Sequence, residues 1–204
     1  MPAESRAAGR AENAELAAAF RTSDAAAVEI IATRLAPLVQ RLVRRLTAWA
    51  GDADDLVQDV LVAALAARAK FRGQSTLETW ITRVTVNCVR AHRRKQWVRS
   101  RLFGGWTRGL DHGDAGEPPS DLGAELKEQA QRVREAVARL PRASRETIVL
   151  HYLEEMTVDE TAAALNVRRG TVEVRLTRAR RQLRELLSLD PETINIPAND
   201  GELL

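Results

Sequence analysis

Hydrophobic residues recur at intervals of three or four over most of this chain, a spacing that places them on one face of an α-helix. The pattern forms two blocks. Between them lie residues 99–123, which contain a Pro-Pro pair and six of the eleven glycines, a composition typical of a linker. No segment alternates between apolar and polar residues as a half-buried β-strand would. The predicted fold class is therefore all-α, with two small helical domains joined by a flexible linker.

The first block, residues 13–98, predicts several helices. The earliest starts around Asn13 and runs through Pro37, where we expect a kink or break because proline lacks the N–H that a helix needs. A turn at Gly51 follows. Residues 52–69 then carry two adjoining rows of apolar residues that make one stripe, with acidic residues on the opposite side.

The next helix is expected to begin at Ser75. Ser75 and Glu78 have the spacing of a capping box, in which each side chain satisfies a backbone N–H of the other residue. The apolar face of this helix should bury five residues: Leu77, Trp80, Ile81, Val84 and Cys88.

The second block, residues 124–187, predicts four helices, of which the last two form a helix-turn-helix. The first of the four should span 124–139 with three residues facing inward: Leu126, Val133 and Val137. The third opens with a capping box of Thr157 and Glu160, and the fourth begins at Arg169 and reaches about Leu187. One seam of apolar residues should dock this last helix: Val172, Leu176, Ala179, Leu183 and Leu186.

Charge and cysteine content narrow the class of protein. The chain has 204 residues with 31 Lys and Arg against 28 Asp and Glu, and a net charge of +3 is too small to indicate a nucleic-acid partner by itself. The lone Cys88 excludes an intrachain disulfide and a multi-cysteine zinc site. Residues 1–19 are charged and lack an apolar run, so we expect neither a signal peptide nor membrane insertion, and a cytoplasmic location. Residues 188–204 contain four acids and no base, which predicts a frayed acidic tail.

Two basic surfaces are candidates for DNA binding. The last helix carries arginines and small polar residues beside its apolar seam, an arrangement suited to the major groove. A second group follows the earlier helix, where Arg83, Asn87, Arg90 and Arg94 fall at steps of four, three and four and so share one stripe. Arginines around an amide can follow a nucleic-acid backbone while the amide reads a base. Each surface has an alternative interpretation as a solvated charged helix face.

Two further segments suggest contacts rather than chemistry. The loop 71–76 can offer backbone amides and hydroxyls to an unstacked base, although most such loops are only loops. Asp52, Asp54, Asp55 and Asp59 cluster with Gln58 at a helix N-terminus, where the dipole explains some of the acids and a docking patch for a basic partner explains the rest.

We find no candidate catalytic residues, metal ligands or cofactor. The paired acids lack a nucleophile or metal partner, and three histidines are too widely separated for a metal site: His92, His112 and His151. We therefore expect that the chain is not an enzyme.

Taken together, residues 14–187 resemble the extracytoplasmic-function group of the bacterial sigma-70 family. Three segments carry the resemblance: DADDLVQDVLVAAL at 52–65, FRGQSTLETWITRVTVNCVRAHRR at 71–94, and LPRASRETIVLHYLEEMTVDETAAALNVRRGTVEVRLTRARRQLREL at 140–186. The resemblance implies a flexible N-terminus at 1–12, region 2 at 13–98 and region 4 at 124–187.

The implied function is a dissociable subunit that directs core RNA polymerase to promoters and helps to open them. Asp52, Asp55, Gln58 and Asp59 would dock on the coiled coil of the β′ subunit, and the linker would thread through the polymerase, whose β subunit is a further expected partner. The minus-ten element would meet a loop and a stripe: Arg72, Gly73, Gln74, Ser75, Thr76, Arg83, Asn87, Arg90 and Arg94. The minus-thirty-five element would meet the last helix: Arg169, Thr171, Glu173, Val174, Thr177, Arg178 and Arg181.

The resemblance also implies that the two domains close around an anti-sigma factor. Glu173 and Val174 depart from the polar or basic pair that relatives often carry, and they can accept from cytosine or contact a thymine methyl. Two alternatives stay open on the sequence: a stand-alone helix-turn-helix regulator, and a helical protein-interaction module without DNA binding.

Overall fold

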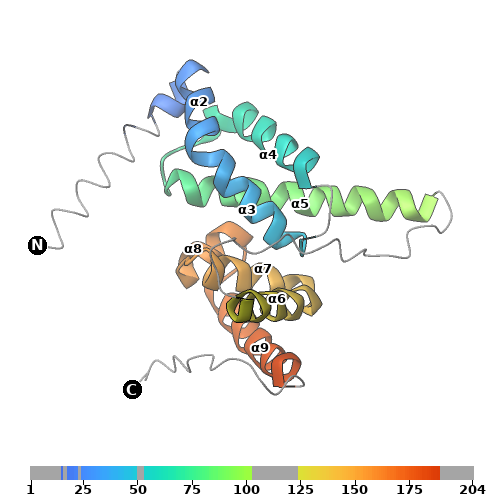
Figure 1. The fold of residues 1–204 in the computed structure, drawn as a ribbon. Helices are drawn as coiled ribbons and strands as arrows, with labels where there is room; N and C mark the ends of the chain where they lie inside the picture. The colour runs from blue at the N-terminus through green and yellow to red at the C-terminus, as the bar shows by residue number, and fades with distance from the viewer. Residues whose placement is uncertain (1–14, 16–17, 23, 50–52, 103–123, 189–204) are drawn as a thin grey trace, which may run out of the picture.

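The computed structural model describes residues 15, 18–22, 24–49, 53–102 and 124–188, and all of its regular secondary structure in these residues is helical. The helices form two units, which Figure 1 shows one above the other. The upper unit contains α2 (Asp24–Ile30), the π-helix η1 (Ile31–Leu35), α3 (Ala36–Leu46), α4 (Ala53–Ala67), the 3₁₀-helix η2 (Arg68–Lys70) and α5 (Leu77–Leu102). The lower unit contains α6 (Ala124–Arg139), α7 (Arg142–Ile148), the π-helix η3 (Val149–Leu153), α8 (Val158–Leu165) and α9 (Arg169–Ser188).

Several expectations fall on residues outside this description. They are the flexible N-terminus, the turn at Gly51, Asp52, most of the linker and the acidic tail after Ser188. Where the linker was expected to begin, at residue 99, the chain is still helical, because α5 continues to Leu102.

Helices α3, α4 and α5 pack on one another to form the core of the first unit. The apolar stripe predicted for α4 is present, with Leu56, Val57 and Val60 buried. Pro37 lies in the first turn of α3, directly after the π-helical turn of η1. A proline cannot donate to the carbonyl four residues back, so the chain widens before it and then resumes as an α-helix.

An aromatic cluster anchors the loop that precedes α5. The ring of Phe71 lies 5.4 Å from that of Trp80 and 6.5 Å from that of Phe20, centroid to centroid. Phe20 is fully buried and Phe71 is 3% exposed. The chain is therefore fixed in the core just before it turns outward at Arg72.

The start of α5 differs from the sequence prediction. The N-cap is Thr76 rather than Ser75, since the Thr76 hydroxyl accepts from the backbone N–H of Thr79 at 3.1 Å. Glu78, which the predicted capping box required, lies 3.5 Å from Arg34. The sequence S-T-L-E offers two cap positions one residue apart, and burial of Leu77 selects the second.

The second unit is a helix-turn-helix supported by α6 and α7. Thr157 and Glu160 form the predicted capping box at the start of α8. Asn166 ends α8 in the left-handed conformation with φ 55°, which asparagine tolerates better than most residues. The predicted seam of α9 is buried from Val172 to Leu183. Leu126 was expected to face inward, but it is 52% exposed because the first turn of α6 extends beyond the core.

The two units contact each other through α8, which packs against α5, and through η3, which packs against α3. Polar contacts also cross this junction, from side chains of one unit to side chains and backbone carbonyls of the other.

The capping box predicts a measurable share of stability. Thr157→Ala removes the hydroxyl that accepts from Glu160 N–H, so the free energy of unfolding should fall by about 1 kcal/mol. Chemical denaturation measures this change. Thr33→Ala is the control, because its exposed hydroxyl only bonds the carbonyl of Glu29, and it should change stability by less than about 0.5 kcal/mol. Equal effects of the two substitutions would contradict the role of the cap.

Candidate nucleic-acid and protein interfaces

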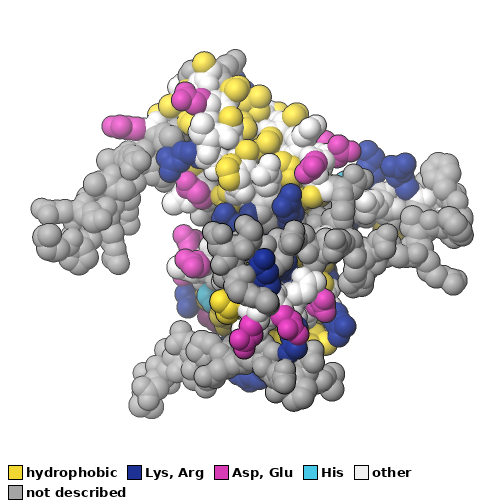
Figure 2. Space-filling model, in the orientation of Figure 1, with side chains coloured by type: hydrophobic (Ala, Val, Ile, Leu, Met, Phe, Trp, Pro, Cys, Tyr) yellow, Lys and Arg dark blue, Asp and Glu magenta, His cyan; other side chains and the backbone are white. Residues whose placement is uncertain are grey.

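One face of α4 is acidic and open to solvent. Asp55, Gln58 and Asp59 are all exposed, whereas Asp52 lies outside the described residues. Val62 shares this face one turn further along and is 68% exposed, which the sequence analysis missed because Val62 falls outside the apolar stripe. Figure 2 shows hydrophobic side chains gathering in the upper part of the molecule with acidic side chains around them. A surface of carboxylates around exposed aliphatic carbon is suited to a protein partner with basic and apolar groups.

The loop before α5 presents short polar groups to solvent. Arg72, Gly73, Gln74 and Thr76 are exposed and Ser75 is half-buried. Gly73 has φ 69°, a conformation that side chains with a Cβ adopt at a cost, and no atom lies within 4 Å of where its Cβ would stand. Space and an unshielded backbone are what an unstacked base would need to approach this loop.

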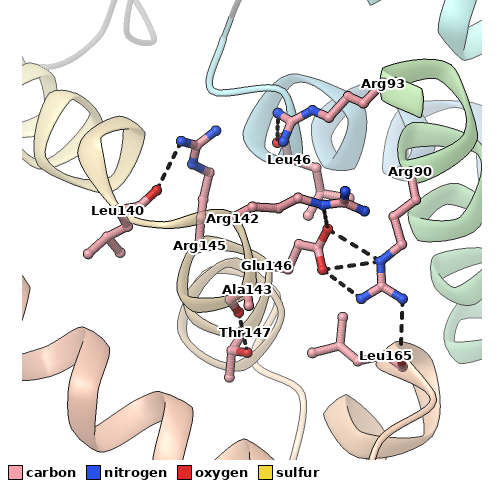
Figure 3. A network of polar contacts seen from close by, with 10 residues as sticks. All are labelled: Leu46, Arg90, Arg93, Leu140, Arg142, Ala143, Arg145, Glu146, Thr147 and Leu165. Atoms are coloured by element: carbon pink, nitrogen blue, oxygen red, sulfur yellow. Dashed lines mark hydrogen bonds and ion pairs between the residues drawn. The ribbon is translucent and has the colours of Figure 1, made fainter. Parts of the chain in front are cut away.

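The basic stripe of α5 is only partly free. Arg83, Asn87 and Arg94 are exposed, but the guanidinium of Arg90 points toward the second unit. It donates through Nη2 to Glu146 Oε2 at 2.6 Å and through Nη1 to the carbonyl of Leu165 at 3.3 Å. Arg90 therefore joins α5 to α7 and to the end of α8 (Figure 3).

Glu146 is the centre of this junction. Glu146 is only 4% exposed. Its Oε2 accepts from Arg90, and its Oε1 accepts from Arg142 Nε at 2.8 Å. Two more arginines stand beside the pair and bond to backbone carbonyls: Arg93 reaches that of Leu46 at 2.9 Å, and Arg145 reaches three carbonyls at the end of α6. One carboxylate thus lies among four guanidinium groups drawn from both units.

The electrostatics of the cluster follow from burial and from charge. Burial raises the pKa of the Glu146 carboxyl, but hydrogen bonds and positive charge from Arg90 and Arg142 outweigh it, and the net pKa is below the ordinary glutamate value. Burial, with the charge of Arg93, lowers the pKa of Arg145 to about 10. Burial and the charge of Arg142 also lower the pKa of Arg93. The arginines repel one another, and Glu146 is the anion that they share.

A second glutamate joins the units on the other side of the junction. The side chain of Glu154, which follows η3, is 4% exposed. It accepts from Arg45 at 2.6 Å and from Arg41 at 2.9 Å, both from α3. Arg45 also donates to the carbonyl of Leu153. Neither glutamate was predicted from the sequence, because neither lies in an apolar run: Glu146 stands between Arg145 and Thr147, and Glu154 stands beside Glu155.

The outer face of α9 remains open to solvent. Five of its expected DNA contacts are exposed: Glu173, Val174, Thr177, Arg178 and Arg181. Arg169 is exposed but paired, since it donates to Glu173 at 2.9 Å and to Asp159 of α8 at 2.8 Å. Thr171 is half-buried. Arg169, expected among the contacts to the minus-thirty-five element, is thus part of an ion-pair chain with Glu173 and Asp159 at the start of α9.

Within the described ranges, no three His, Cys, Asp or Glu side chains come together as a metal site would require. In the same part of the chain, none of the helices combines the length and the apolar character needed to cross a bilayer.

Comparison with known proteins finds two family models that match successive parts of this chain. Residues 31–99 match the model of sigma-70 region 2, and residues 130–183 match that of sigma-70 region 4. The ECF RNA polymerase sigma factor SigM of Mycobacterium tuberculosis (strain Erdman) is 32% identical over 186 residues, which cover 90% of this chain and 89% of the relative. The RNA polymerase sigma factor CnrH of Cupriavidus metallidurans is 36% identical over 145 residues, 69% of this chain and 76% of the relative.

Two solved structures are similar in fold. The sigma factor RpoE in complex with the anti-sigma factor NepR from Bartonella quintana has a TM-score of 0.66 at 26% identity, covering 79% of this chain and 96% of that chain. CnrH in complex with the cytosolic domain of CnrY has a TM-score of 0.61 at 28% identity, covering 87% and 98%.

The Glu146 cluster predicts a pH dependence. Because the folded pKa is lowered, the ionised carboxylate stabilises the fold fully above the ordinary glutamate pKa of about 4.3, and this stabilisation is lost as pH falls through the lowered value. At pH 7, Glu146→Gln should lower the free energy of unfolding by about 1.5–3 kcal/mol. Thermal unfolding measures the difference in stability between the parent and the variant, and this difference should become smaller as the pH falls toward 3.

The matched control is Glu128→Gln, which alters a 65% exposed carboxylate paired with Arg132 within α6. Its effect should be small at every pH. A Glu146→Gln deficit that is the same at pH 7 and pH 3 would contradict the electrostatic account.

Proposed function

This chain belongs to the extracytoplasmic-function group of the bacterial sigma-70 family, and from that premise we propose which of its surfaces perform each part of promoter recognition. As an ECF sigma factor, it binds core RNA polymerase, recognises the minus-thirty-five and minus-ten elements and promotes strand opening. The observation that carries this function is the presence of both regions in order along one chain, at 31–99 and 130–183. Neither a stand-alone regulator nor an interaction module is favoured.

The acidic face of α4 is our proposed docking surface for the β′ subunit. Asp55, Gln58 and Asp59 offer carboxylates and an amide, and Val62 adds exposed apolar surface on the same side of the helix. Opposite charges steer the encounter, while the apolar contact contributes affinity once water leaves. Core polymerase works in the cytoplasm, so we place the function of the chain there.

The exposed loop before α5 and the stripe of α5 are our proposed minus-ten site. Gly73 and its neighbours would receive a flipped base of the non-template strand, while Arg83, Asn87 and Arg94 would follow the strand beside it. Binding to the extruded base and to phosphates offsets an unstacking cost of a few kcal/mol. Strand opening then proceeds by trapping, and we infer that the chain itself performs no catalysis.

The exposed face of α9 is our proposed reader of the minus-thirty-five element. Arg178 and Arg181 stand one turn apart, away from the buried seam, and Val174 presents an apolar group to the same side. Arginine pairs with guanine edges, and valine contacts a thymine methyl. Because Arg169 is held by Glu173 and Asp159, its proposed role is to orient Glu173 toward the groove.

An anti-sigma factor is the remaining proposed partner. The similar sigma factor RpoE was solved in complex with the anti-sigma factor NepR. We propose that a protein of this class binds the present chain as well.

Run-off transcription with purified core RNA polymerase tests the function and the docking surface together. The chain should add promoter-specific starts on genomic fragments. If the starts do not exceed those of core enzyme alone, the proposed function is contradicted.

The variant that combines Asp55→Lys and Asp59→Lys tests the docking surface. It should bind core enzyme roughly 10- to 100-fold more weakly, because like charges would then face each other.

The control for this variant combines Glu125→Lys and Glu128→Lys, which make the same charge change on exposed positions of α6. It should keep core binding, and circular dichroism should show equal helicity in both variants. Normal co-purification of the α4 variant with core enzyme would remove α4 from the docking surface.

Arg178→Ala tests the reading face. The substitution should weaken binding to duplex carrying the minus-thirty-five element by about 1–3 kcal/mol if Arg178 contacts a base edge. A gel-shift titration measures the change. Arg184→Ala removes another exposed arginine of α9 outside the proposed set and should have a smaller effect. Equal losses from both substitutions would show that the reading face lies elsewhere.

A further inference from the structure

A polar cavity lies where the turn of the helix-turn-helix meets α5 and α7. Its volume is about 520 Å³, within the range of about 300–1,000 Å³ that is usual for small-molecule sites. Six polar residues of its lining come from three helices and from the turn between α8 and α9: Asn87, Arg90, Arg142, Glu146, Asn166 and Arg175. The cavity opens to solvent, so a small molecule can enter it.

Positive charge exceeds negative charge in this lining. Three arginines meet one carboxylate there, and that carboxylate is already satisfied, because Glu146 accepts from Arg90 at 2.6 Å and from Arg142 at 2.8 Å. Burial, and then the charge of Arg142, lower the pKa of the neighbouring Arg93. The guanidinium groups therefore repel one another, and an anion that enters the cavity relieves this repulsion.

Two of the arginines still have N–H groups to donate. Half-buried Arg175 makes no hydrogen bond or ion pair within the described ranges, and its Nη1 is buried without an acceptor. Arg142 bonds to Glu146 through Nε alone, so its two terminal nitrogens have no acceptor among the residues that the structure describes (Figure 3). A guanidinium binds phosphate oxygens in pairs with this fork of donors. The two arginines can therefore hold phosphate groups from two different helices, α7 and α9.

The other walls of the cavity add amides and aliphatic surface. Asn87 and Asn166 are exposed, and neither side-chain amide bonds to another residue in the described part of the chain. An amide both donates and accepts, so it can pair with a ribose hydroxyl or with the edge of a base. Leu165 and Val167 also line the cavity and give a planar ring an apolar surface on which to pack.

From these groups we propose that the cavity is a binding site for a nucleotide with two or more phosphate groups. Arg142 and Arg175 bind the phosphates, and the amides of Asn87 and Asn166 hold the ribose or the base. Glu146 keeps its bonds to Arg90 and Arg142 and fixes the wall of the site. Arg142, Asn166 and Arg175 belong to none of the surfaces proposed for DNA or core polymerase, so the site can be tested separately from them.

Isothermal titration calorimetry of the free, full-length chain at low salt measures the binding. The probes are adenosine, AMP, ADP, ATP and inorganic pyrophosphate, all without magnesium. ADP and ATP should bind at one site per chain and roughly tenfold more tightly than AMP, because two arginine forks are available for their phosphates. Pyrophosphate should bind more weakly than ADP, since it lacks the ribose and base, and adenosine should not bind measurably.

Substitutions locate the binding in the cavity. Arg175→Gln should lower ADP affinity about 10- to 100-fold, because a hydrogen bond between charged groups is lost. Arg175→Lys keeps the charge without the fork and should give an intermediate affinity. Asn166→Gly removes an amide at φ 55°, a conformation that glycine adopts freely, and should lower ADP affinity about 2- to 10-fold while pyrophosphate affinity stays unchanged.

The matched control is Arg184→Gln, which makes the same charge change at an exposed position of α9 outside the cavity. It should leave ADP affinity unchanged. Circular dichroism and thermal unfolding of every variant show whether the fold is retained. If Arg175→Gln does not fold, the comparison of Arg175→Lys and Asn166→Gly with the control decides.

The proposal is overturned if none of ADP, ATP and pyrophosphate binds at millimolar concentration, or if cavity and control variants lose affinity equally. A fluorescein-labelled, random-sequence single-stranded DNA separates a free nucleotide from a nucleic-acid backbone as the source of the phosphates. If Arg175→Gln weakens binding of this strand and leaves ADP affinity unchanged, the cavity receives nucleic acid and the proposal fails. Run-off transcription by the parent chain is a separate measurement, so loss of this site leaves the proposed function standing.

Discussion

The buried carboxylate of Glu146 is the centre of the polar contacts through which the two halves of this protein meet. It accepts from Arg142 of its own helix and from Arg90 of the other unit, and it balances two further arginines nearby. A charge cluster of this kind depends on geometry far more than apolar packing does, since each guanidinium is costly to bury without its partner. The units are therefore held in a specific orientation by this charge cluster together with the packing of α8 against α5.

Each unit contributes its own buried residues to the apolar core. Phe20, Phe71 and Val60 come from the first unit, and Leu150 and Val172 come from the second. Among the described residues these side chains form one continuous cluster, so apolar packing joins the units as well as the charges do. The surfaces proposed for core polymerase and duplex DNA are exposed on α4 and α9, whereas Arg90 in the α5 stripe is bonded across the junction.

Local pattern was sufficient to predict most helices and the helix-turn-helix. The seam from Val172 to Leu183 and the capping box at Thr157 depend on neighbours within one or two turns, and both were identified correctly. The start of α5 was wrong by one residue, since Ser75 and Thr76 are equivalent by local chemistry and the packing of Leu77 decides between them.

Local sequence pattern could not predict the contacts at the junction, because they join residues far apart in the sequence. Arg90 and Glu146 are 56 residues apart, and Arg45 and Glu154 are 109 apart, so no local period relates them. Arg90 was assigned to a stripe from its helical position alone, which gives the direction of a side chain and not what stands opposite it. The positions of Arg83, Asn87 and Arg94 in that stripe agree with the spacing, and their proposed roles stay predictions. Val62 was overlooked because an exposed valine has no periodic signature.

The ion-pair chain at the start of α9 has a consequence for the thermodynamics of promoter binding. Asp159, Arg169 and Glu173 already satisfy one another, so Arg169 has no need of a phosphate as its counter-ion. An arginine that is already paired with carboxylates displaces few condensed cations from the duplex. Each displaced cation adds to the dependence of binding on ionic strength. The α9 helix should therefore bind the minus-thirty-five element less through the phosphate backbone and more through the base edges. Its preference among sequences should persist as the salt concentration rises.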